Sequence, residues 1–376
     1  MIYLDNAATT LIKPPGVREA VAEAIGSMGN PGRSGHIAAT HAADAVFRCR
    51  TIASELFDLS VNGVVFTLNA THALNIAIRT LVAPNAKVVI SGFEHNSVTR
   101  LLHALNAEIT VAGDRLFDTA YSVESFDRAI TPDTAAVIVN HVSNVFGFIQ
   151  PLEEIAALCR KKHVPLIVDA AQSAGVLPLS CEKLGAAFIA MPGHKSLFGP
   201  QGTGLLLCND TPEPLLYGGT GSYSLLASMP EELPDRIEAG TLNVPGICGL
   251  SAGLQFISEQ GTDRIRTHEE ALRKILTEKL QQLPDCRVFC GSAANQVGTV
   301  SAVFENTDVE AAAQWLAERG IAVRAGLHCA PLAHRSAGTE KTGTVRFGVS
   351  ALNTVTEAFA ACETLAKKDG WKPGKF

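Results

Sequence analysis

One lysine in this sequence stands where a reactive amine would be expected. Lys195 follows the apolar run 186–190 and the segment Met191-Pro192-Gly193-His194, so it is predicted to lie at the end of a buried strand. A lysine in that position is costly unless it is paired or neutralised. Burial lowers the pKa of an amine and frees its lone pair for imine formation. Lys195 is therefore a candidate for covalent attachment to an aldehyde.

A carboxylate ends a second predicted strand, because Asp169 directly follows the apolar residues 166–168. A lysine for the aldehyde and an acid for the ring nitrogen are the two groups that pyridoxal 5'-phosphate (PLP) requires. Aspartate and lysine at strand ends also form ordinary surface ion pairs. The two residues alone leave both interpretations open.

The composition is that of a globular enzyme. The chain has 376 residues, of which 47% are hydrophobic and 18% charged, enough for two domains and a large core. A net charge of −6 without a basic stripe argues against a nucleic-acid partner. The first residues show no signal-peptide pattern, and no apolar run reaches the roughly 18 residues of a membrane span. We therefore predict no membrane association.

The nine cysteines are scattered along the chain and odd in number. Cys286 and Cys290 lie close together, but no matching Cys or His pair stands nearby, so no metal site is predicted. Mostly buried thiols in a reducing compartment are the ordinary interpretation. We therefore predict a cytoplasmic protein.

Short apolar strands alternate with helical patterns in the first two thirds of the chain. Strands are predicted at 64–67, 88–91, 135–140, 166–169, 187–190 and 204–207, and helices at 95–105 and 151–162. This alternation indicates an α/β fold with a mostly parallel central sheet covered by helices. Such sheets bind ligands at the carboxyl ends of their strands, where Asn144, Asp169 and Lys195 fall.

A change of pattern after Gly249 predicts a second domain. Residues 251–283 are helical in pattern, 297–304 and 322–324 resemble strands, and 356–367 resembles a closing helix. We predict a large cofactor-binding domain over residues 15–250. A smaller α+β C-terminal domain is predicted over 251–376, joined by residues 1–14. The glycine-rich stretch 217–222 predicts a mobile loop near the site.

A series of short motifs runs along nearly the whole chain. They are 3–10 (YLDNAATT), 94–98 (EHNSV), 141–147 (HVSNVFG), 168–173 (VDAAQS), 193–195 (GHK), 238–241 (EAGT), 324–330 (RAGLHCA) and 345–348 (VRFG). In this order they resemble the motifs of cysteine desulfurases of the class V aminotransferase family. These are PLP-dependent enzymes of fold type I, and the chain resembles the branch related to selenocysteine lyases.

The resemblance implies a cofactor role for many of these residues. Lys195 would hold PLP as an imine and later move the α-proton, while Asp169 would face the pyridine nitrogen. The cofactor-binding positions carried over are Ala70, Thr71, His95, Asn144, Asp169, Gln172, His194, Lys195 and Thr241. Thr241 follows the family's phosphate contact from a second subunit, so the resemblance also implies a homodimer.

Three of these positions concern the ring of the cofactor. Gln172 and Asn144 are placed by the family pattern near the ring hydroxyl. His95 would lie over the ring face, where an aromatic side chain holds the cofactor flat and passes protons. The alternative for His95 is a helix N-terminal residue with a satisfied hydrogen bond.

At the phosphate the chain departs from the family. Residues 69–74 follow a predicted strand and precede a helical pattern, the right context for phosphate binding at a helix N-terminus. Ala70 stands where many relatives have a second threonine, His72 where they have glutamate, and Pro192 where they have a phosphate-binding serine. His194, Thr71 and backbone amides would have to suffice, which puts the affinity for PLP in doubt. A plain strand–helix turn is the alternative.

The resemblance implies that the substrate-binding residues are Arg346, Asn144 and His36. Arg346 would bind the substrate carboxylate, which arginine suits because its planar fork makes two parallel hydrogen bonds. A structural arginine paired with a surface acid is the alternative. Cys329 lies between a glycine and a proline, so it is predicted to sit in a loop that lets a nucleophile move. Arg324 and His328 are expected to favour its thiolate. The predicted catalytic residues are therefore Lys195, Cys329 and His95.

The implied activity is the conversion of L-cysteine to L-alanine, with sulfur left as a persulfide on Cys329 and passed to an acceptor protein. Selenocysteine is a further implied substrate. A PLP-dependent transaminase or a kynureninase-like lyase on the same fold stays open, because neither needs a cysteine nucleophile. A non-catalytic PLP-binding sulfur-relay protein also stays open, motivated by Ala70 and Pro192.

Overall fold

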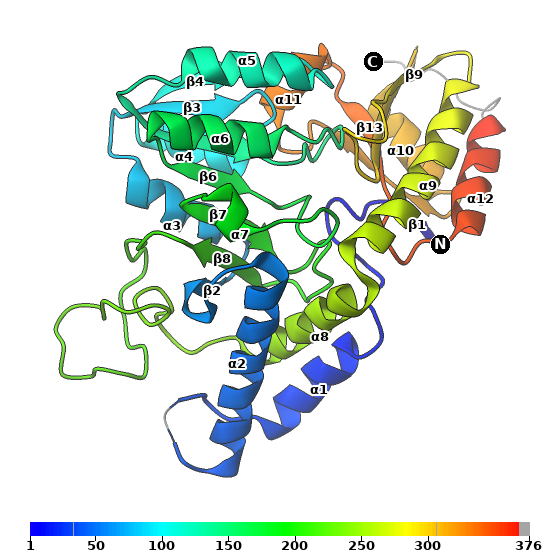
Figure 1. Cartoon of the computed structure of the whole chain (residues 1–376). Coiled ribbons are helices and arrows are strands. Elements are labelled where there is room, and N and C mark those ends of the chain that lie inside the picture. The colour runs from blue at the N-terminus through cyan, green and yellow to red at the C-terminus, as the bar shows by residue number, and fades with distance from the viewer. Residues whose placement is uncertain (33, 306, 368–376) are drawn as a thin grey trace.

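The computed structural model describes residues 1–32, 34–305 and 307–367. The chain forms a large unit around a seven-stranded sheet and a smaller unit around a four-stranded sheet (Figure 1). The N-terminus lies with the smaller unit, because β1 (Ile2–Tyr3) pairs in parallel with β11 (Ile321–Ala322). The first strand of the chain therefore pairs with a strand of the smaller unit.

The large sheet is mostly parallel, which confirms the predicted fold class. Its strands, in spatial order, are β2 (Val64–Thr67), β8 (Gly204–Cys208), β7 (Phe188–Pro192), β6 (Leu166–Asp169), β5 (Thr134–Asn140), β3 (Lys87–Ser91) and β4 (Glu108–Ala112). Only β8 runs antiparallel to its neighbours, β2 and β7. The polar residues that follow β5, β6 and β7 therefore meet at one edge of the sheet.

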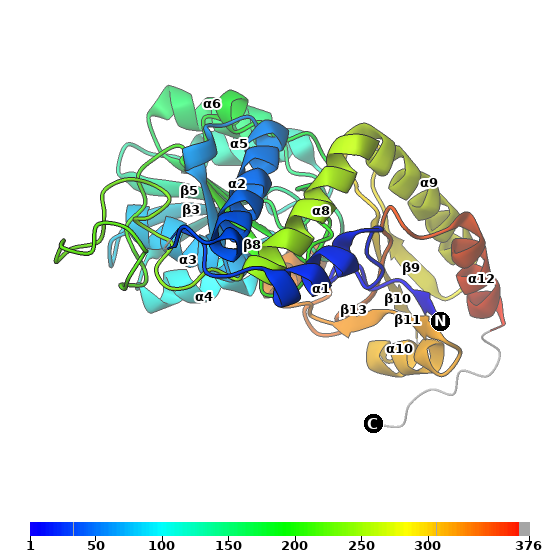
Figure 2. The same ribbon diagram turned by 90° about the horizontal axis from the view of Figure 1, so that it is seen from below.

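Helices cover both faces of this sheet, with the strands between them in Figure 2. One face carries α3 (Ala70–Leu81) and α4 (Asn96–Ala104). The other carries α2 (Ile37–Phe57), α5 (Thr119–Ala129), α6 (Leu152–Lys162), α7 (Cys181–Leu184) and α8 (Val244–Gln260), with α1 (Val17–Ser27) packed on α8. Because both faces are buried, the central strands are apolar along their length rather than alternating.

Two helices start directly after strand ends, each through a local side-chain cap. The Asn69 side chain accepts from the His72 amide at the start of α3, and the His95 ring accepts from the Ser97 amide at the start of α4. Each cap satisfies an amide that the helix leaves unpaired. The first turns of α3 and α4 therefore open at the catalytic edge of the sheet.

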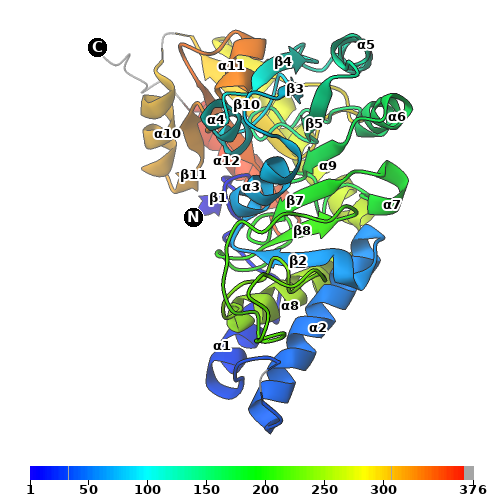
Figure 3. The same cartoon turned by 90° about the vertical axis from the view of Figure 1, so that its left-hand side faces the viewer.

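The smaller unit is α+β. Its antiparallel sheet has the order β12 (Arg324–Gly326), β13 (Thr344–Gly348), β10 (Thr299–Phe304) and β9 (Cys286–Phe289). Around it lie α9 (Thr262–Gln281), α10 (Val309–Ala317), α11 (Pro331–Ala337) and α12 (Val355–Ala366) (Figure 3). β12 carries Arg324, β13 carries Arg346, and the turn between β12 and α11 carries Cys329. This unit therefore brings the predicted substrate-binding groups to the large sheet.

The predicted helical stretch 251–283 is two helices, α8 and α9, separated at Gly261. Gly261 has a φ of 78°, a conformation that glycine adopts at little cost. Buried residues of α8 belong to the core of the large unit, whereas Leu272, Leu276 and Leu280 of α9 belong to that of the smaller one. The packing partner thus changes after α8, and the predicted boundary at residues 250 and 251 falls inside that helix.

Within the described ranges, none of the helices combines the length and apolar character needed to cross a membrane.

Candidate active site

Lys195 and Asp169 are brought together at the carboxyl edge of the large sheet. Asp169 ends β6 and lies beside Ala190 of β7 in the parallel register, while Lys195 follows the end of β7. Burial lowers the pKa of Lys195 to about 8, and the charge of Asp169 opposes that shift. Burial also raises the pKa of Asp169, which is 2% exposed. The amine is thus within reach of its neutral, nucleophilic form near neutral pH.

The turn that presents Lys195 is fixed by backbone contacts. The Gly193 amide donates to the Thr203 carbonyl at 2.8 Å, and the Phe198 amide donates to the Lys195 carbonyl at 2.9 Å. A Cβ at position 193 would lie 2.1 Å from Thr203 Oγ1, so only glycine fits there. The turn therefore holds the lysine in one place before any cofactor arrives.

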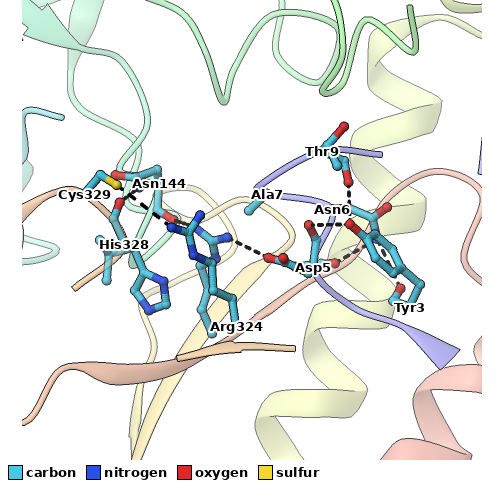
Figure 4. A network of polar contacts seen from close by, with 12 residues as sticks. Tyr3, Asp5, Asn6, Ala7, Thr9, Asn144, Arg324, His328 and Cys329 are labelled. Atoms are coloured by element: carbon cyan, nitrogen blue, oxygen red, sulfur yellow. Dashed lines mark hydrogen bonds and ion pairs between the residues drawn. The ribbon is translucent and has the colours of Figure 1, made fainter. Parts of the chain in front are cut away.

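The N-terminal segment 5–13, here called the N-terminal strap, contacts the site at several points, and Figure 4 shows its residues Asp5, Asn6, Ala7 and Thr9. Thr10 Oγ1 donates to the carbonyls of His194 and Lys195, both at 3.1 Å, and Lys13 Nζ donates to the His194 carbonyl at 3.2 Å. The carbonyl of Ala7 accepts from Gln172 Nε2 at 2.8 Å. The strap therefore braces the lysine turn and the loop after β6.

Arg346 is almost completely buried, with 1% of its side chain exposed. Its Nη1 donates to the Asn144 carbonyl at 2.9 Å and its Nη2 to Asp5 Oδ1 at 2.8 Å. Burial lowers the pKa of Arg346, and the charge of Asp5 opposes this. The guanidinium is therefore held at the junction of the strap, the large sheet and β13.

Cys329 is the most accessible thiol of the chain. Of the nine cysteines, all within the described ranges, Cys329 alone is exposed. Arg324 Nη2 lies 3.9 Å from its Sγ. Its carbonyl accepts from the Asn96 amide at 2.8 Å, and Asn144 Nδ2 donates to the carbonyl of His328 at 2.8 Å (Figure 4). The loop is thus tied to the large unit through backbone carbonyls, which leaves the thiol accessible.

The backbone of this loop is unusual at two successive residues. His328 has a φ of 48° and Cys329 a φ of 59°, in the left-handed region that non-glycine residues rarely adopt. The His328 ring contacts Thr344, and burial lowers its pKa to about 2. His328 is therefore neutral and supplies no charge for the thiolate, contrary to expectation, and Arg324 is the cation beside Cys329.

His95 lies in the site as a neutral ring. Burial, together with the nearby charges of Lys195 and Arg324, lowers its pKa to about 4. Because Nδ1 accepts from the Ser97 amide at 3.1 Å, the single ring proton belongs on Nε2. The expected ordinary role as a helix cap is thus present, and it fixes the tautomer that faces the other residues.

The expected phosphate end lies at the start of α3, which packs against β7 and β8. Thr71 is exposed there and Ala70 is partly buried. His72 turns back and its Nδ1 accepts from the Leu68 amide at 3.2 Å. Pro192 is the buried last residue of β7. Of the predicted phosphate contacts, Thr71 is thus exposed, and His194 Nδ1 has no hydrogen-bond partner within the described structure.

A family model described as Aminotransferase class-V matches residues 2–359. This chain belongs to the class V aminotransferase family. Curated relatives include a "Probable cysteine desulfurase" of Xylella fastidiosa strain Temecula1, 32% identical over 88% of this chain and 82% of the relative. One of Streptomyces coelicolor is 33% identical over 88% and 83% of the two chains.

Solved structures of cysteine desulfurases have the same fold as this chain. The apo cysteine desulfurase of Thermococcus onnurineus NA1 matches with a TM-score of 0.89 and 29% identity, over 98% of this chain and 94% of that one. The Escherichia coli cysteine desulfurase CsdA, in an S-sulfonic acid form, matches with a TM-score of 0.85 and 25% identity, over 97% and 94%. The PLP-dependent fold type I expected from the sequence is thereby confirmed.

Class V aminotransferases depend on PLP, and the residues at this edge fit it. A buried acid and an amine of lowered pKa stand next to each other, as the ring nitrogen and the aldehyde require. His194 Nδ1 and Asn144 Oδ1, at this edge, are among the buried polar atoms that have no hydrogen-bond partner within the described structure. Buried polar atoms are normally satisfied, so these two indicate where a bound polar group belongs.

Two residues predicted to bind substrate or cofactor, His36 and Thr241, lie on the surface of this class V aminotransferase. His36 is exposed and caps α2, where its Nδ1 accepts from the Ala39 amide. Thr241 is exposed in the segment before α8. The preceding Glu238 is buried, pairs with both Nη atoms of Arg50 at 2.9 Å and accepts from the Phe66 amide.

Sequence reasoning passed over Asp5 and Glu94, although both lie in the matched motifs. Glu94 is buried, and its Oε1 accepts from Ser91 Oγ and from the Asn140 amide at 2.6 Å. Burial raises the pKa of Glu94 to about 8, and the charge of Asp169 adds to that shift. Glu94 therefore holds the end of β5 beside Asp169. An acid three residues after the end of an apolar strand, 88–91, was the signal that could have revealed it.

Proposed function

We propose that this chain is a cysteine desulfurase that converts L-cysteine to L-alanine and keeps the sulfur as a persulfide on Cys329. The observation that carries the proposal is the exposed Cys329 thiol beside Arg324, with its loop tied to the same Asn144 that contacts Arg346. The names of the curated relatives support it. A transaminase or a kynureninase-like lyase has no use for this thiol.

Arg346 and Asn144 are proposed to bind the substrate carboxylate. Arg346 offers a planar fork of donors, and its burial strengthens each hydrogen bond that it makes. This anchoring orients the amino acid so that its Cα–H reaches Lys195 Nζ, which takes the α-proton. When bound, PLP supplies the electron sink for the electrons of that bond, with Asp169 keeping its ring nitrogen protonated.

The sulfur step balances within the two thiols and the substrate carbon. The Cys329 thiolate attacks the substrate sulfur, an S–S bond forms, and the Cβ–S bond breaks. The two sulfur atoms are together oxidised by two electrons, and Cβ is reduced from CH₂ to CH₃. Arg324 favours the attacking thiolate at 3.9 Å. His95 Nε2–H is proposed to hold the substrate sulfur by a hydrogen bond, and this sulfur keeps its proton in the Cys329 persulfide while Cβ takes up a proton.

The direct test is a product assay on the PLP-loaded protein. L-cysteine with a thiol reductant should yield equal amounts of alanine and sulfide, and L-selenocysteine should yield alanine and selenide. Pyruvate as amino acceptor and L-kynurenine serve as controls for the two alternative activities. Alanine from kynurenine, or transamination without sulfide release, would contradict the proposal. A PLP-loaded protein that turns over none of these would support a sulfur-relay role instead.

We also propose that the active unit is a homodimer, with Thr241 completing the phosphate site of the other subunit. The irregular segment 209–243 runs beside α2 (Figure 1). Both carry exposed apolar side chains: Ile37, Phe47, Leu216, Tyr217, Tyr223, Leu225 and Leu226. Such a surface is typical of a subunit interface. His36 lies at the start of α2, on the same side.

Sedimentation should show a dimer at working concentrations, and mixed subunits test the shared site. Lys195→Ala and Thr241→Ala proteins, unfolded and refolded together, should form mixed dimers with one intact site. The mixture should recover activity that the Lys195→Ala dimer lacks. A fully active monomer, or no gain on mixing, would argue against the shared site.

We propose two domains that move as separate bodies, with the change placed near Gly261 rather than inside α8, because the cores of α8 and α9 differ. We further propose a cytoplasmic protein, since a persulfide on an exposed thiol needs reducing surroundings to turn over. The sulfur acceptor is proposed to be a protein that approaches the Cys329 loop.

A further inference from the structure

The substrate-binding arginine already has a carboxylate partner. We propose that Asp5 is a built-in competitor of the substrate carboxylate for Arg346, and that it determines how tightly the enzyme holds its amino acid. This inference rests on the proposed function for the class of substrate, an α-amino acid bound through Arg346. Asp5 is a positioning residue here, because it acts on the substrate through Arg346.

Burial explains why Arg346 has a resident counter-ion. Its side chain is 1% exposed, whereas that of Asp5 is 21% exposed. A buried charge without a partner costs several kcal/mol, roughly, whereas a paired one is tolerated. Without substrate, Asp5 therefore stabilises the guanidinium at 2.8 Å. The charge of Asp5 raises the pKa of Arg346 and so opposes the decrease that burial causes.

The contact between the two side chains is a single one. Asp5 uses Oδ1 alone on Nη2, while Nη1 donates to the Asn144 carbonyl and the buried Nε has no partner within the described structure. Bidentate carboxylate–arginine pairs are stronger than monodentate ones. A substrate carboxylate that binds Arg346 with both oxygens therefore binds more strongly than the single oxygen of Asp5.

Asp5 has a route away from Arg346 that leaves the backbone in place. Its chain is held by an isolated bridge to Gly348, and the neighbouring Asn6 Nδ2 donates to the Gly348 carbonyl at 2.9 Å. Only the partly exposed carboxylate has to turn toward solvent. If it stayed, two carboxylates would share one guanidinium, and like charges at that distance repel strongly.

The energetic consequence is a penalty specific to ligands with a carboxylate. Each such ligand must displace Asp5 or accept its repulsion, so part of its binding free energy is lost. A ligand whose carboxylate is replaced by a neutral amide forms no ion pair with Arg346 and is not repelled by Asp5, so it does not incur this penalty. Removing the Asp5 charge should therefore strengthen the binding of ligands with a carboxylate and leave the binding of the amide ligands unchanged.

The test compares L-alanine with L-alaninamide in the PLP-loaded wild type and Asp5→Asn variant. Binding is followed by the change in cofactor absorbance, so turnover is not required. Asp5→Asn should lower the dissociation constant of L-alanine roughly tenfold, about 1.4 kcal/mol. The constant for L-alaninamide should stay within about twofold. Asp127→Asn, which breaks an exposed ion pair with Lys162 elsewhere, should behave as wild type.

An unchanged or higher constant for L-alanine in Asp5→Asn overturns the proposal, because Asp5 would then assist or ignore the substrate. Equal tightening of both ligands also overturns it. Asp5→Ser provides a second neutral variant should Asp5→Asn fail to fold, as judged by thermal unfolding, and Asp5→Glu should restore weaker binding. Failure of the proposed desulfurase is seen separately, as a wild type that binds L-alanine but releases no sulfide from cysteine.

Discussion

Lys195→Ala should lose the covalent attachment of PLP together with turnover of every amino acid. The amine at this position forms the bond to the aldehyde and takes the α-proton, and alanine can do neither. Proton transfer alone accounts for roughly 10²–10⁴-fold in rate. Absorbance of the purified variant should show no protonated imine, and alanine release from cysteine should be undetectable.

In the wild-type protein, the role of Lys195 can be tested through the pH dependence of PLP binding. Burial lowers the pKa of Lys195 to about 8, so its neutral amine is abundant at a pH where an ordinary lysine is almost fully protonated. The rate at which cofactor-free protein captures PLP should rise with pH and level off above about 8. Lys274→Ala, which removes an exposed lysine of α9, serves as the control. Normal turnover in Lys195→Ala would refute the assignment.

Cys329→Ala should still bind cysteine, with the absorbance change that accompanies binding, but release almost no alanine from it. No other exposed thiol is available among the nine cysteines, all of which the structure describes, to take the sulfur. We expect a loss of at least about a hundredfold, or about 2.7 kcal/mol of transition-state stabilisation. Activity on selenocysteine should survive, because selenium leaves without a protein thiol.

Mass spectrometry of the wild type identifies the acceptor atom directly. A brief exposure to cysteine should add one sulfur to the peptide that contains Cys329. Cys248→Ala, which removes a buried thiol, should leave that product unchanged. Added sulfur confined to another cysteine would rule out Cys329 as the nucleophile.

Much of the fold was predictable because its strands are buried on both faces. Strands 64–67 and 166–169 match β2 and β6 to the residue, and Val355–Ala366 matches the predicted closing helix within one residue at either end. The break at Gly261 was not predicted. The charge pattern continues through it, and only the change of core partner between α8 and α9 reveals two helices.

The candidate site was predictable where a residue type carries its own chemistry. Lys195, Asp169 and Cys329 are recognisable in this way, and the structure brings Lys195 and Asp169 together while tying the Cys329 loop to Asn144. The contact of Asp5 with Arg346 joins residues 341 positions apart, which no local pattern encodes. His328 was misjudged because a ring beside a thiol in sequence turned into the core toward Thr344.

The N-terminal strap has a consequence for how a newly made chain matures. Its contacts reach 165 residues ahead to Gln172, 185 to Lys195 and 341 to Arg346. The ribosome therefore releases the strap first, but the last of its partners emerges only when the chain is almost finished. Contacts of such long sequence separation form slowly. A growing chain can build the central sheet during synthesis, yet the contacts that close this edge of the sheet can form only when translation is nearly over.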